Sequence, residues 1–278
     1  MMRNVLNRVL RRRRFLLIMC FVSFYFYINL ESVPEDSYSG TVLTDLVPYH
    51  NKTEQSLIIS NRNFCKNYFA NSSSGKSLLV LILSKMNHYF HRSEIRSTWA
   101  KHRVYNNVKF AHLFVVGSLD SNELILAESE KHKDIVMFNF KESYNNLTAK
   151  TSLGMTWVYL YCQEADLVLK TDDDVFLRHD LISPLINTMP MKGVYTGACY
   201  NRAKPYRRKN KNVPLYWNKW LITKDEFKGK YYPPYCNGIG YILSRDVIKF
   251  LQPKLFKVPF FRFEDVYIGM CINKGIHS

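Results

Sequence analysis

Three adjacent aspartates, Asp172, Asp173 and Asp174, are the residues of this chain whose types and spacing point most directly to chemistry. They follow the apolar run 167–169, which predicts a buried parallel strand, and strand ends are where open α/β sheets place ligand sites. A hard divalent cation such as Mg²⁺ or Mn²⁺ would offset the repulsion among the carboxylates and also hold a substrate diphosphate. In an extended segment, Asp172 and Asp174 point the same way and are the predicted ligands. The alternative is a solvated acidic turn before a helix that begins near His179.

The charge of the chain narrows the class of partner. The formal net charge is +16 over 278 residues, and a hydrophobic share of 47% is ordinary for a globular protein. Six arginines lie within residues 1–14, and a second basic cluster extends from Arg202 to Lys211. Such a surface indicates an anionic partner. The candidates are nucleic acid, anionic lipid, a nucleotide diphosphate and an acidic glycan.

The N-terminus predicts a membrane anchor. Residues 15–30 are uncharged and mostly apolar. As a helix they would span roughly 24 Å, which suits a thin early-secretory bilayer. Arginines before the run and acids after it place residues 1–14 in the cytosol and the remainder in the lumen. A cleaved signal peptide is the alternative, with its best cleavage site at 37–39, and it delivers the chain to the same lumen.

Two further features agree with a lumenal address. Glycosylation sequons begin at Asn51, Asn71 and Asn146. An odd number of cysteines follows the apolar run, which in an oxidising compartment leaves one thiol unpaired or without its partner. These cysteines are Cys65, Cys162, Cys199, Cys236 and Cys271.

The organisation of the chain predicts an α/β domain. Residues 31–76 are polar, lack periodicity and predict a stem, followed by a folded domain at 77–278. Strands alternate with helices there, which predicts right-handed βαβ units and a mostly parallel sheet. The expected strands are 78–83, 110–116, 135–140 and 167–169, and the expected helices are 91–101, 122–132 and an amphipathic 145–161. No repeat, P-loop, dinucleotide glycine fingerprint or zinc-type spacing occurs.

Six segments occur in a specific order between residues 78 and 276. They are 92–99, 114–117, 142–151, 170–176, 232–241 and 263–269. Together they resemble the signatures of the inverting β1,3-galactosyl- and β1,3-N-acetylglucosaminyltransferases, glycosyltransferase family 31, whose type II Golgi layout also has an anchor and stem. The resemblance implies a GT-A, Rossmann-like nucleotide-sugar-binding domain, a UDP-sugar donor, Mn²⁺ or Mg²⁺, and a glycan acceptor on protein or lipid. Galactose or an N-acetylhexosamine would be transferred in β1,3 linkage.

The resemblance also implies roles for single residues. Asp172 and Asp174 would bind the metal, which acts as a Lewis acid on the leaving UDP. Asp173 would accept hydrogen bonds from hydroxyls of the donor's ribose or sugar. Asp265 would be the base that takes the acceptor hydroxyl's proton on the far side of the sugar. Its neighbour Glu264, also on the acceptor side, would raise the pKa of Asp265 by like-charge repulsion.

The half of the chain after Gly193 is rich in aromatics and prolines and is expected to shape the acceptor cleft. Gly238 and Gly240 lack side chains and would permit close approach of the backbone to a sugar ring. Flat apolar faces for stacking on sugars would come from Tyr235, Tyr241, Trp217 and Trp220.

Several residues have a structural alternative. Arg96 and Lys150 either contact the donor or pair with a carboxylate inside the fold. Trp99 and Trp157 are expected in the core. The motif at Asn146 is either glycosylated or serves only to begin a helix.

Two other functions compete with glycosyl transfer. Members of the family generally continue past Ser278 with a histidine-bearing segment that helps to complete the metal and donor site, so the C-terminus is expected to be incomplete. A catalytically inactive lumenal relative that acts as a partner or chaperone is therefore the main alternative. Nucleic-acid binding, suggested by the charge, is disfavoured by the anchor, the sequons and the lack of a basic-aromatic RNA-binding signature.

Overall fold

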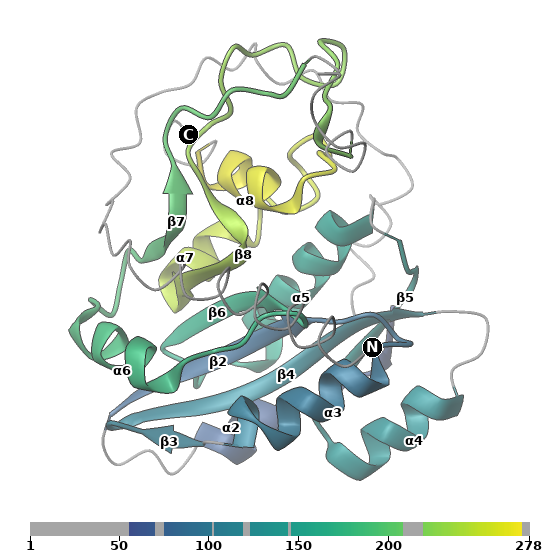
Figure 1. Cartoon of the computed structure of the whole chain (residues 1–278), viewed down its shortest axis with the longest axis vertical. Coiled ribbons are helices and arrows are strands. Elements are labelled where there is room, and N and C mark those ends of the chain that lie inside the picture. The colour runs from purple at the N-terminus through teal and green to yellow at the C-terminus, as the bar shows by residue number, and fades with distance from the viewer. Residues whose placement is uncertain are drawn as a thin grey trace, which may run out of the picture.

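The computed structural model describes residues 56–69, 75–101, 103–118, 123–143, 146–207 and 219–273. Its centre is one twisted sheet in the order β1-β5-β4-β2-β6-β8-β7, with β3 paired to β4 (Figure 1). The four central strands run parallel and are β5 (Ile135–Lys141), β4 (Val108–Ser118), β2 (Lys76–Leu83) and β6 (Leu167–Asp172). The outer strands are antiparallel and are β1 (Leu57–Ile59), β3 (Val104–Tyr105), β7 (Tyr195–Tyr200) and β8 (Tyr235–Ser244).

Helices cover both faces of this sheet, and each face has its own core. One face packs against α3 (Tyr89–Ser97), the short 3₁₀ helix η3 (Trp99–Lys101), α4 (Glu123–His132) and α6 (His179–Thr188). The other packs against α2 (Phe64–Phe69), α5 (Leu147–Tyr161), α7 (Arg245–Leu251) and α8 (Glu264–Asn273). Trp99 and Trp157 lie in these two cores, as expected. The predicted α/β class with a mostly parallel central sheet is confirmed.

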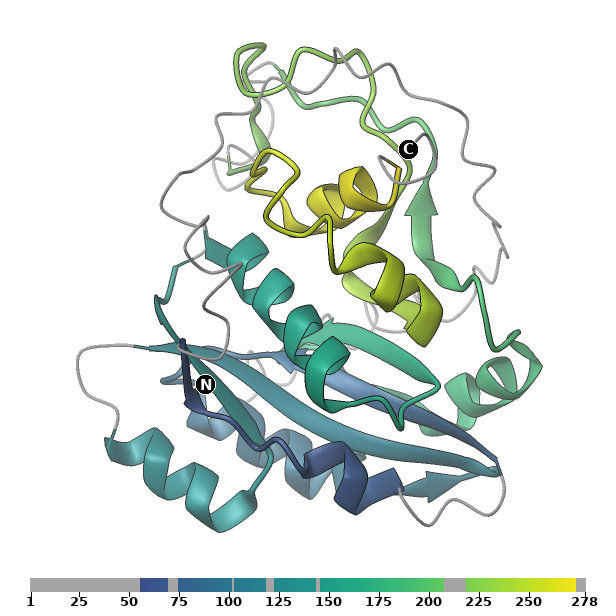
Figure 2. The same cartoon turned by 180° about the vertical axis from the view of Figure 1, so that it is seen from behind.

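Helix α5 differs from the amphipathic helix that the sequence predicts. Every residue from 148 to 158 is buried. The helix lies between the sheet and the C-terminal helices α7 and α8, so both of its sides are covered (Figure 2). Gly154 allows the close approach, because a Cβ there would lie 3.2 Å from Leu81.

The segment before β2 contributes more to the fold than the sequence indicates. β1 pairs with β5, and α2 follows it within the range assigned to the stem. A disulfide joins Cys65 of α2 to Cys162 at the end of α5. We therefore expect the folded domain to begin before residue 77. The predicted anchor, 15–30, lies outside the described residues, and none of the helices within them is long and apolar enough to cross a membrane.

The antiparallel edge of the sheet begins the second half of the chain. β8 pairs with β6 and β7 pairs with β8. A second disulfide joins Cys199 of β7 to Cys236 of β8. Cys271 is buried in α8 and belongs to neither disulfide. β8 therefore lies between β7 and β6, the strand that carries the aspartates.

Candidate functional site

The aspartates lie where the strand order of the sheet reverses. From β2 the chain proceeds to β4 and β5 on one side and then returns to β6 on the other. Such a reversal opens a ligand crevice outside the carboxyl ends of the strands. Asp172 is the last residue of β6 and is in register with Leu83 at the end of β2, and the Asp173 amide donates to the Leu83 carbonyl at 3.2 Å. The predicted position at a strand end is confirmed.

Asp172 and Asp174 fit a cation that is shared with a substrate. Burial raises the pKa of the Asp172 carboxyl, Lys170 opposes this, and repulsion by Asp174 and Asp173 raises that pKa further. The Asp172 side chain is 36% exposed and Asp174 is exposed, so both present oxygen to solvent. Among the residues that the structure describes, no three His, Cys, Asp or Glu side chains gather as a metal cage. Two carboxylates with phosphate oxygens and water completing the shell is the arrangement typical of Mg²⁺.

Asp173 is engaged by a histidine that the sequence did not single out. Its Oδ2 lies 2.8 Å from Nδ1 of His88, and the ring of His88 stacks on His91 with centroids 4.3 Å apart. The Asp173 side chain is only 10% exposed. One of its oxygens is thus committed to His88, and its contact with a ribose or sugar hydroxyl stays a prediction.

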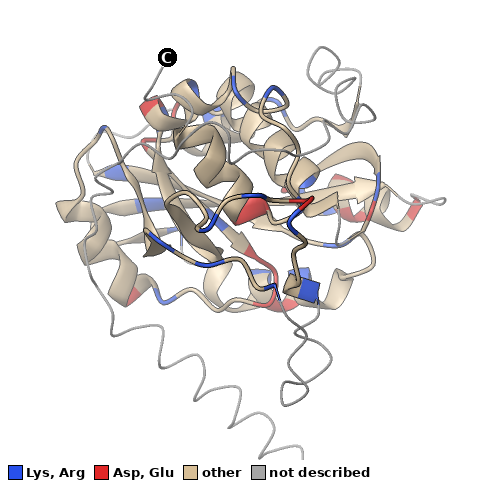
Figure 3. Cartoon of the chain, turned by 90° about the horizontal axis from the view of Figure 1, so that it is seen from above, with Lys and Arg blue, Asp and Glu red and all other residues tan. Residues whose placement is uncertain are grey.

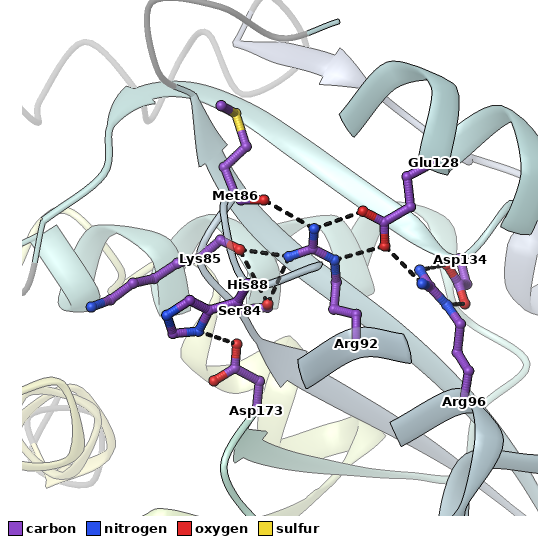
Figure 4. Close-up of polar contacts among 9 residues, drawn as sticks. All are labelled: Ser84, Lys85, Met86, His88, Arg92, Arg96, Glu128, Asp134 and Asp173. Carbon is purple, nitrogen blue, oxygen red and sulfur yellow. Dashed lines mark hydrogen bonds and ion pairs between the residues drawn. The ribbon is translucent and has the colours of Figure 1, made fainter. Parts of the chain in front are cut away.

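A buried arginine fixes the segment that carries His88 (Figure 4). Arg92 of α3 is fully buried and donates to Ser84 Oγ at 3.0 Å and to the Met86 carbonyl at 2.9 Å. It also donates to the Lys85 carbonyl at 2.5 Å and to Glu128 of α4, with two bonds of 2.8 and 2.7 Å. Helix α4 therefore holds the turn after β2, and with it His88, through a single guanidinium.

Arg96 forms an ion pair inside the fold. Its guanidinium donates to both oxygens of Asp134, at 2.8 and 2.7 Å, and to Glu128 at 2.7 Å (Figure 4). It also lies 4.9 Å from the ring centroid of Phe114. All three of its nitrogens are bonded on the α4 side of the sheet. This geometry favours the structural alternative, and donor binding by Arg96 stays a prediction without support from the contacts.

Lys150 lies closer to the aspartates. Its Nζ is 2.5 Å from Glu142 Oε1 and donates to the Ser84 carbonyl at 2.7 Å. Burial lowers the pKa of the Lys150 ammonium, while Glu142, Asp173 and Asp172 oppose that change. Lys150 thus pairs with Glu142 yet acts electrostatically on the site.

Lys170 connects the aspartates to α8. Its fully buried Nζ donates to Asp172 Oδ1 at 3.0 Å, to Glu264 Oε1 at 2.6 Å and to the Gly238 carbonyl at 2.7 Å. One signal for this role is visible in the sequence, because a lysine inside an apolar strand two residues before Asp172 needs a buried partner. The partner is 94 residues away and could not be identified from the sequence.

Glu264 is buried in the protein interior next to Lys170. It is 4% exposed, and its Oε2 accepts a hydrogen bond from the Tyr241 hydroxyl at 3.1 Å. Burial raises the pKa of Glu264 to about 7, with Lys170 opposing and Asp265 adding to the rise. Its oxygens are therefore bonded to the protein, and contact with an acceptor sugar stays a prediction.

Asp265 lies in the first turn of helix α8, and its carboxylate is held by two backbone amides. Its Oδ2 accepts from the Gly238 amide at 3.1 Å and its Oδ1 from the Val266 amide at 2.8 Å. Burial raises the pKa of Asp265, and these two amides oppose the rise. The main cause is therefore burial and not the repulsion by Glu264 that the sequence suggested. Gly238 and Gly240 place β8 against α8 and β6.

The two glycines of β8 differ in what they require. A Cβ on Gly238 would lie 2.6 Å from Glu264 Oε1, so glycine is needed there by contact within the protein. A Cβ on Gly240 would meet only ordinary contacts of 3.6 Å and more. The approach of either glycine to a sugar stays a prediction.

The aromatic candidates occupy different environments. Tyr235 is partly exposed, its ring centroid lies 5.5 Å from that of Tyr200, and burial raises the pKa of its hydroxyl. Tyr241 is fully buried and cannot stack on a sugar, so that expectation is wrong. Trp220 is half-buried against the core, and Trp217 lies outside the described residues.

Of the three sequons, only the one at Asn146 is described. Its Nδ2 donates to the Lys141 carbonyl at 2.8 Å, and Thr148 is buried with its hydroxyl bonded to the Phe261 carbonyl at 2.7 Å. Asn146 precedes α5 without a side-chain cap. Asn51 and Asn71 fall outside the described residues.

The sheet, its strand reversal and the carboxylates at its edge are consistent with the GT-A glycosyltransferases. Residues 90–277 match the model of the galactosyltransferase family, and the chain belongs to that family. It is 35% identical over 201 residues to mouse beta-1,3-galactosyltransferase 5, covering 71% of this chain and 63% of that relative. It is 31% identical over 277 residues to beta-1,3-galactosyltransferase 1 of mouse and of human, covering 94% of this chain and 82% of each relative. The resemblance drawn from the six segments is confirmed.

Proposed function

We propose that the protein is an inverting, metal-dependent hexosyltransferase of GT-A fold. It moves galactose or an N-acetylhexosamine from a UDP-sugar to a glycan acceptor in β1,3 linkage. In this proposal residues 15–30 anchor it in the Golgi membrane and the domain lies in the lumen, where it serves protein or lipid glycosylation. One observation carries the proposal. The buried ammonium of Lys170 bonds both Asp172 and Glu264, so one of the proposed metal ligands and the residue before Asp265 belong to one hydrogen-bonded network.

On the donor side, Asp172 and Asp174 would hold Mn²⁺ or Mg²⁺. The ion would supply Lewis-acid stabilisation of the leaving UDP. The protein positions the Asp172 carboxylate, because the buried Lys170 ammonium bonds its Oδ1. The Asp172 side chain is still partly exposed and can bind a ligand from solvent. The His88–Asp173 pair borders the same edge, and Arg92 keeps it in place.

On the acceptor side, Asp265 removes the proton of the attacking hydroxyl. A one-step displacement with inversion requires a base opposite the leaving group. Two backbone amides orient the Asp265 carboxylate at the start of α8, and burial raises its pKa, which makes it a stronger base than a free aspartate. Tyr235 and Trp217 are the side chains proposed to contact the acceptor sugar.

The test is a donor screen on the full-length protein in detergent. UDP-galactose, UDP-N-acetylglucosamine and UDP-N-acetylgalactosamine are each supplied with Mn²⁺ and a panel of glycan acceptors, and the product linkage is read by NMR. We expect transfer from one donor, a β1,3 product and loss of activity with chelator. A protein that binds UDP with Mn²⁺ yet transfers nothing would instead be the catalytically inactive relative.

A further inference from the structure

A cluster of three cations surrounds one tyrosine ring in the second half of the chain. The Arg202 guanidinium carbon lies 4.8 Å from the ring centroid of Tyr231, and the Nζ atoms of Lys204 and Lys230 lie 5.9 and 5.6 Å from it. All three cations are exposed, and the ring is partly exposed. We call these four residues the Tyr231 cluster.

The charges of the Tyr231 cluster are not neutralised by neighbouring acids. The stretch from Tyr195 to Lys224 contains eight lysines and arginines and no aspartate or glutamate, and of the two acids that follow before Lys230, Asp225 and Glu226, the second pairs with Arg262. Within the described part of the chain, none of the three cations forms an ion pair. Figure 3 shows lysine and arginine along the loops as well as on the helices. Because they share one ring, the three charges lie within about one Debye length of one another and repel.

The cluster is nevertheless held on an ordered frame. The Tyr232 amide donates to the Ala203 carbonyl at 2.8 Å, which joins the two segments that carry the cations. Arg207 donates to the Phe227 carbonyl at 2.5 Å and to the Gly229 carbonyl at 3.0 Å, so this arginine fixes the turn before Lys230. Of these four basic residues, Arg207 therefore has a structural role, and Arg202, Lys204 and Lys230 are exposed. In a basic loop that was only solvated, no arginine would need to fix the backbone while three other cations stayed exposed around one ring.

The frame continues directly into the acceptor side of the site. The Tyr232 ring contacts Tyr235 at 6.1 Å, and β8 then leads to Gly238, whose amide bonds Asp265. Gly238 is seven positions after Tyr231, so the two lie at most about 25 Å apart. An oligosaccharide whose reacting hydroxyl is at Asp265 would have to span no more than about this distance to reach the cluster.

We propose that the Tyr231 cluster binds a negatively charged substituent of the glycan acceptor, namely the carboxylate of a sialic acid or a sulfate ester. This proposal rests on the proposed function and specifies that the glycan acceptor is negatively charged. Lysine and arginine form charge-assisted hydrogen bonds with such oxyanions, and the planar fork of Arg202 suits two oxygens at once. The bound anion would offset the repulsion among the three cations, which the Tyr231 ring holds close together.

The experiment compares lactose, sialyllactose and sulfated lactose as probes of binding to the full-length protein without donor. The variant is Arg202→Gln/Lys204→Gln/Lys230→Gln. The matched control is Lys101→Gln/Lys131→Gln/Lys249→Gln, which removes the same charge from exposed positions on other elements. Three exposed ion pairs together favour the anionic probes over lactose by roughly tenfold at low salt. We expect the variant to lose this preference and the control to keep it.

Affinity for UDP with Mn²⁺ is measured in parallel and should be equal in all three proteins, which shows that the variants fold. Preference for sialyllactose alone or sulfated lactose alone identifies the source of the oxyanion, and either supports the proposal. Equal binding of lactose and both anionic probes by the wild type would overturn it, as would a preference that survives in the variant. Preference for an acidic peptide over the anionic glycans would overturn it too. Because no transfer is needed, a failed donor screen leaves this result readable.

Discussion

Lys170 and Glu264 are bonded at 2.6 Å in the interior of the protein, 94 residues apart in the chain. Neither side chain is more than 4% exposed. Each therefore depends on the other, since an unpaired charge in a water-excluded position is costly. The pair lies between the strand that ends at Asp172 and the helix that carries Asp265. The pair therefore helps to fix the position of Asp172 relative to Asp265.

Lys170→Met should destabilise the protein by about 3–5 kcal/mol, because it leaves the Glu264 carboxyl buried without its cation. Urea unfolding of the full chain measures this change. The double variant Lys170→Met/Glu264→Gln should recover much of the loss, since the second change removes the unpaired charge. If the double variant is no more stable than the single one, the two residues are not coupled as the geometry indicates.

Stability should depend on pH through Glu264. Its folded pKa of about 7 exceeds its ordinary value of 4.5, so the folded state holds the proton more tightly than the unfolded state. The free energy of unfolding should therefore fall as pH rises from about 4.5 to 7, at most by about 1.4 kcal/mol per pH unit. Glu264→Gln should flatten the curve in this window. An equally steep fall in Glu264→Gln would assign the titration to another group.

Asp174→Ala should weaken UDP binding in Mn²⁺ by at least about tenfold, because one remaining carboxylate is a poor site for a hard cation. Calorimetry with and without the metal measures the effect. Asp180→Ala is the matched control, since Asp180 is a nearby acid on α6 that pairs with Arg178. Unchanged metal-dependent affinity in Asp174→Ala would remove this residue from the metal site.

Asp265→Asn should reduce transfer by roughly 10²–10⁴-fold, the usual contribution of a general base. UDP-sugar affinity should hardly change, because the predicted base faces the acceptor. Both quantities are to be measured on the same preparation. Joint loss of affinity and rate would show that Asp265 is structural at the start of α8, and retention of both would move the base elsewhere.

Glycosylation should distinguish the three sequons. Asn146 has its amide bonded to Lys141, and Thr148 is buried. Asn146→Gln should therefore leave the gel mobility of the secreted-pathway protein unchanged, whereas Asn51→Gln and Asn71→Gln should each increase it. Glycosidase treatment supplies the reference mobility. A lack of any glycan on the wild type would contradict the lumenal topology.

The central strands were predictable because their apolar runs fill both faces of the sheet. β1 was not, since Leu57–Ile59 is too short to show a pattern and is defined by pairing with β5. Helix α5 appeared amphipathic because threonine and serine are polar by type, yet the covering helices bury them. The local sequence pattern was enough to predict most of the secondary structure. The predictions were wrong where contacts with distant parts of the chain decide which residues are buried.

The site was predictable only in part for the same reason. Asp172, Asp174 and Asp265 stand in local motifs that the sequence displays. The sequence does not show which side chains bond to one another, because Lys170 and Glu264, or Arg96 and Asp134, meet only after the sheet has formed. His88 carried no spacing signal, and its contact with Asp173 depends on how Arg92 folds the turn after β2.

The disulfide between Cys65 and Cys162 has a mechanical consequence. Any tension along the chain from its N-terminal side enters the described residues at 56 and meets this covalent bond at Cys65. Only β1 and the turn after it can be peeled away by such a force. Beyond Cys65 the disulfide passes part of the load to Cys162 at the C-terminal end of α5, so α2 and α5 bear it together.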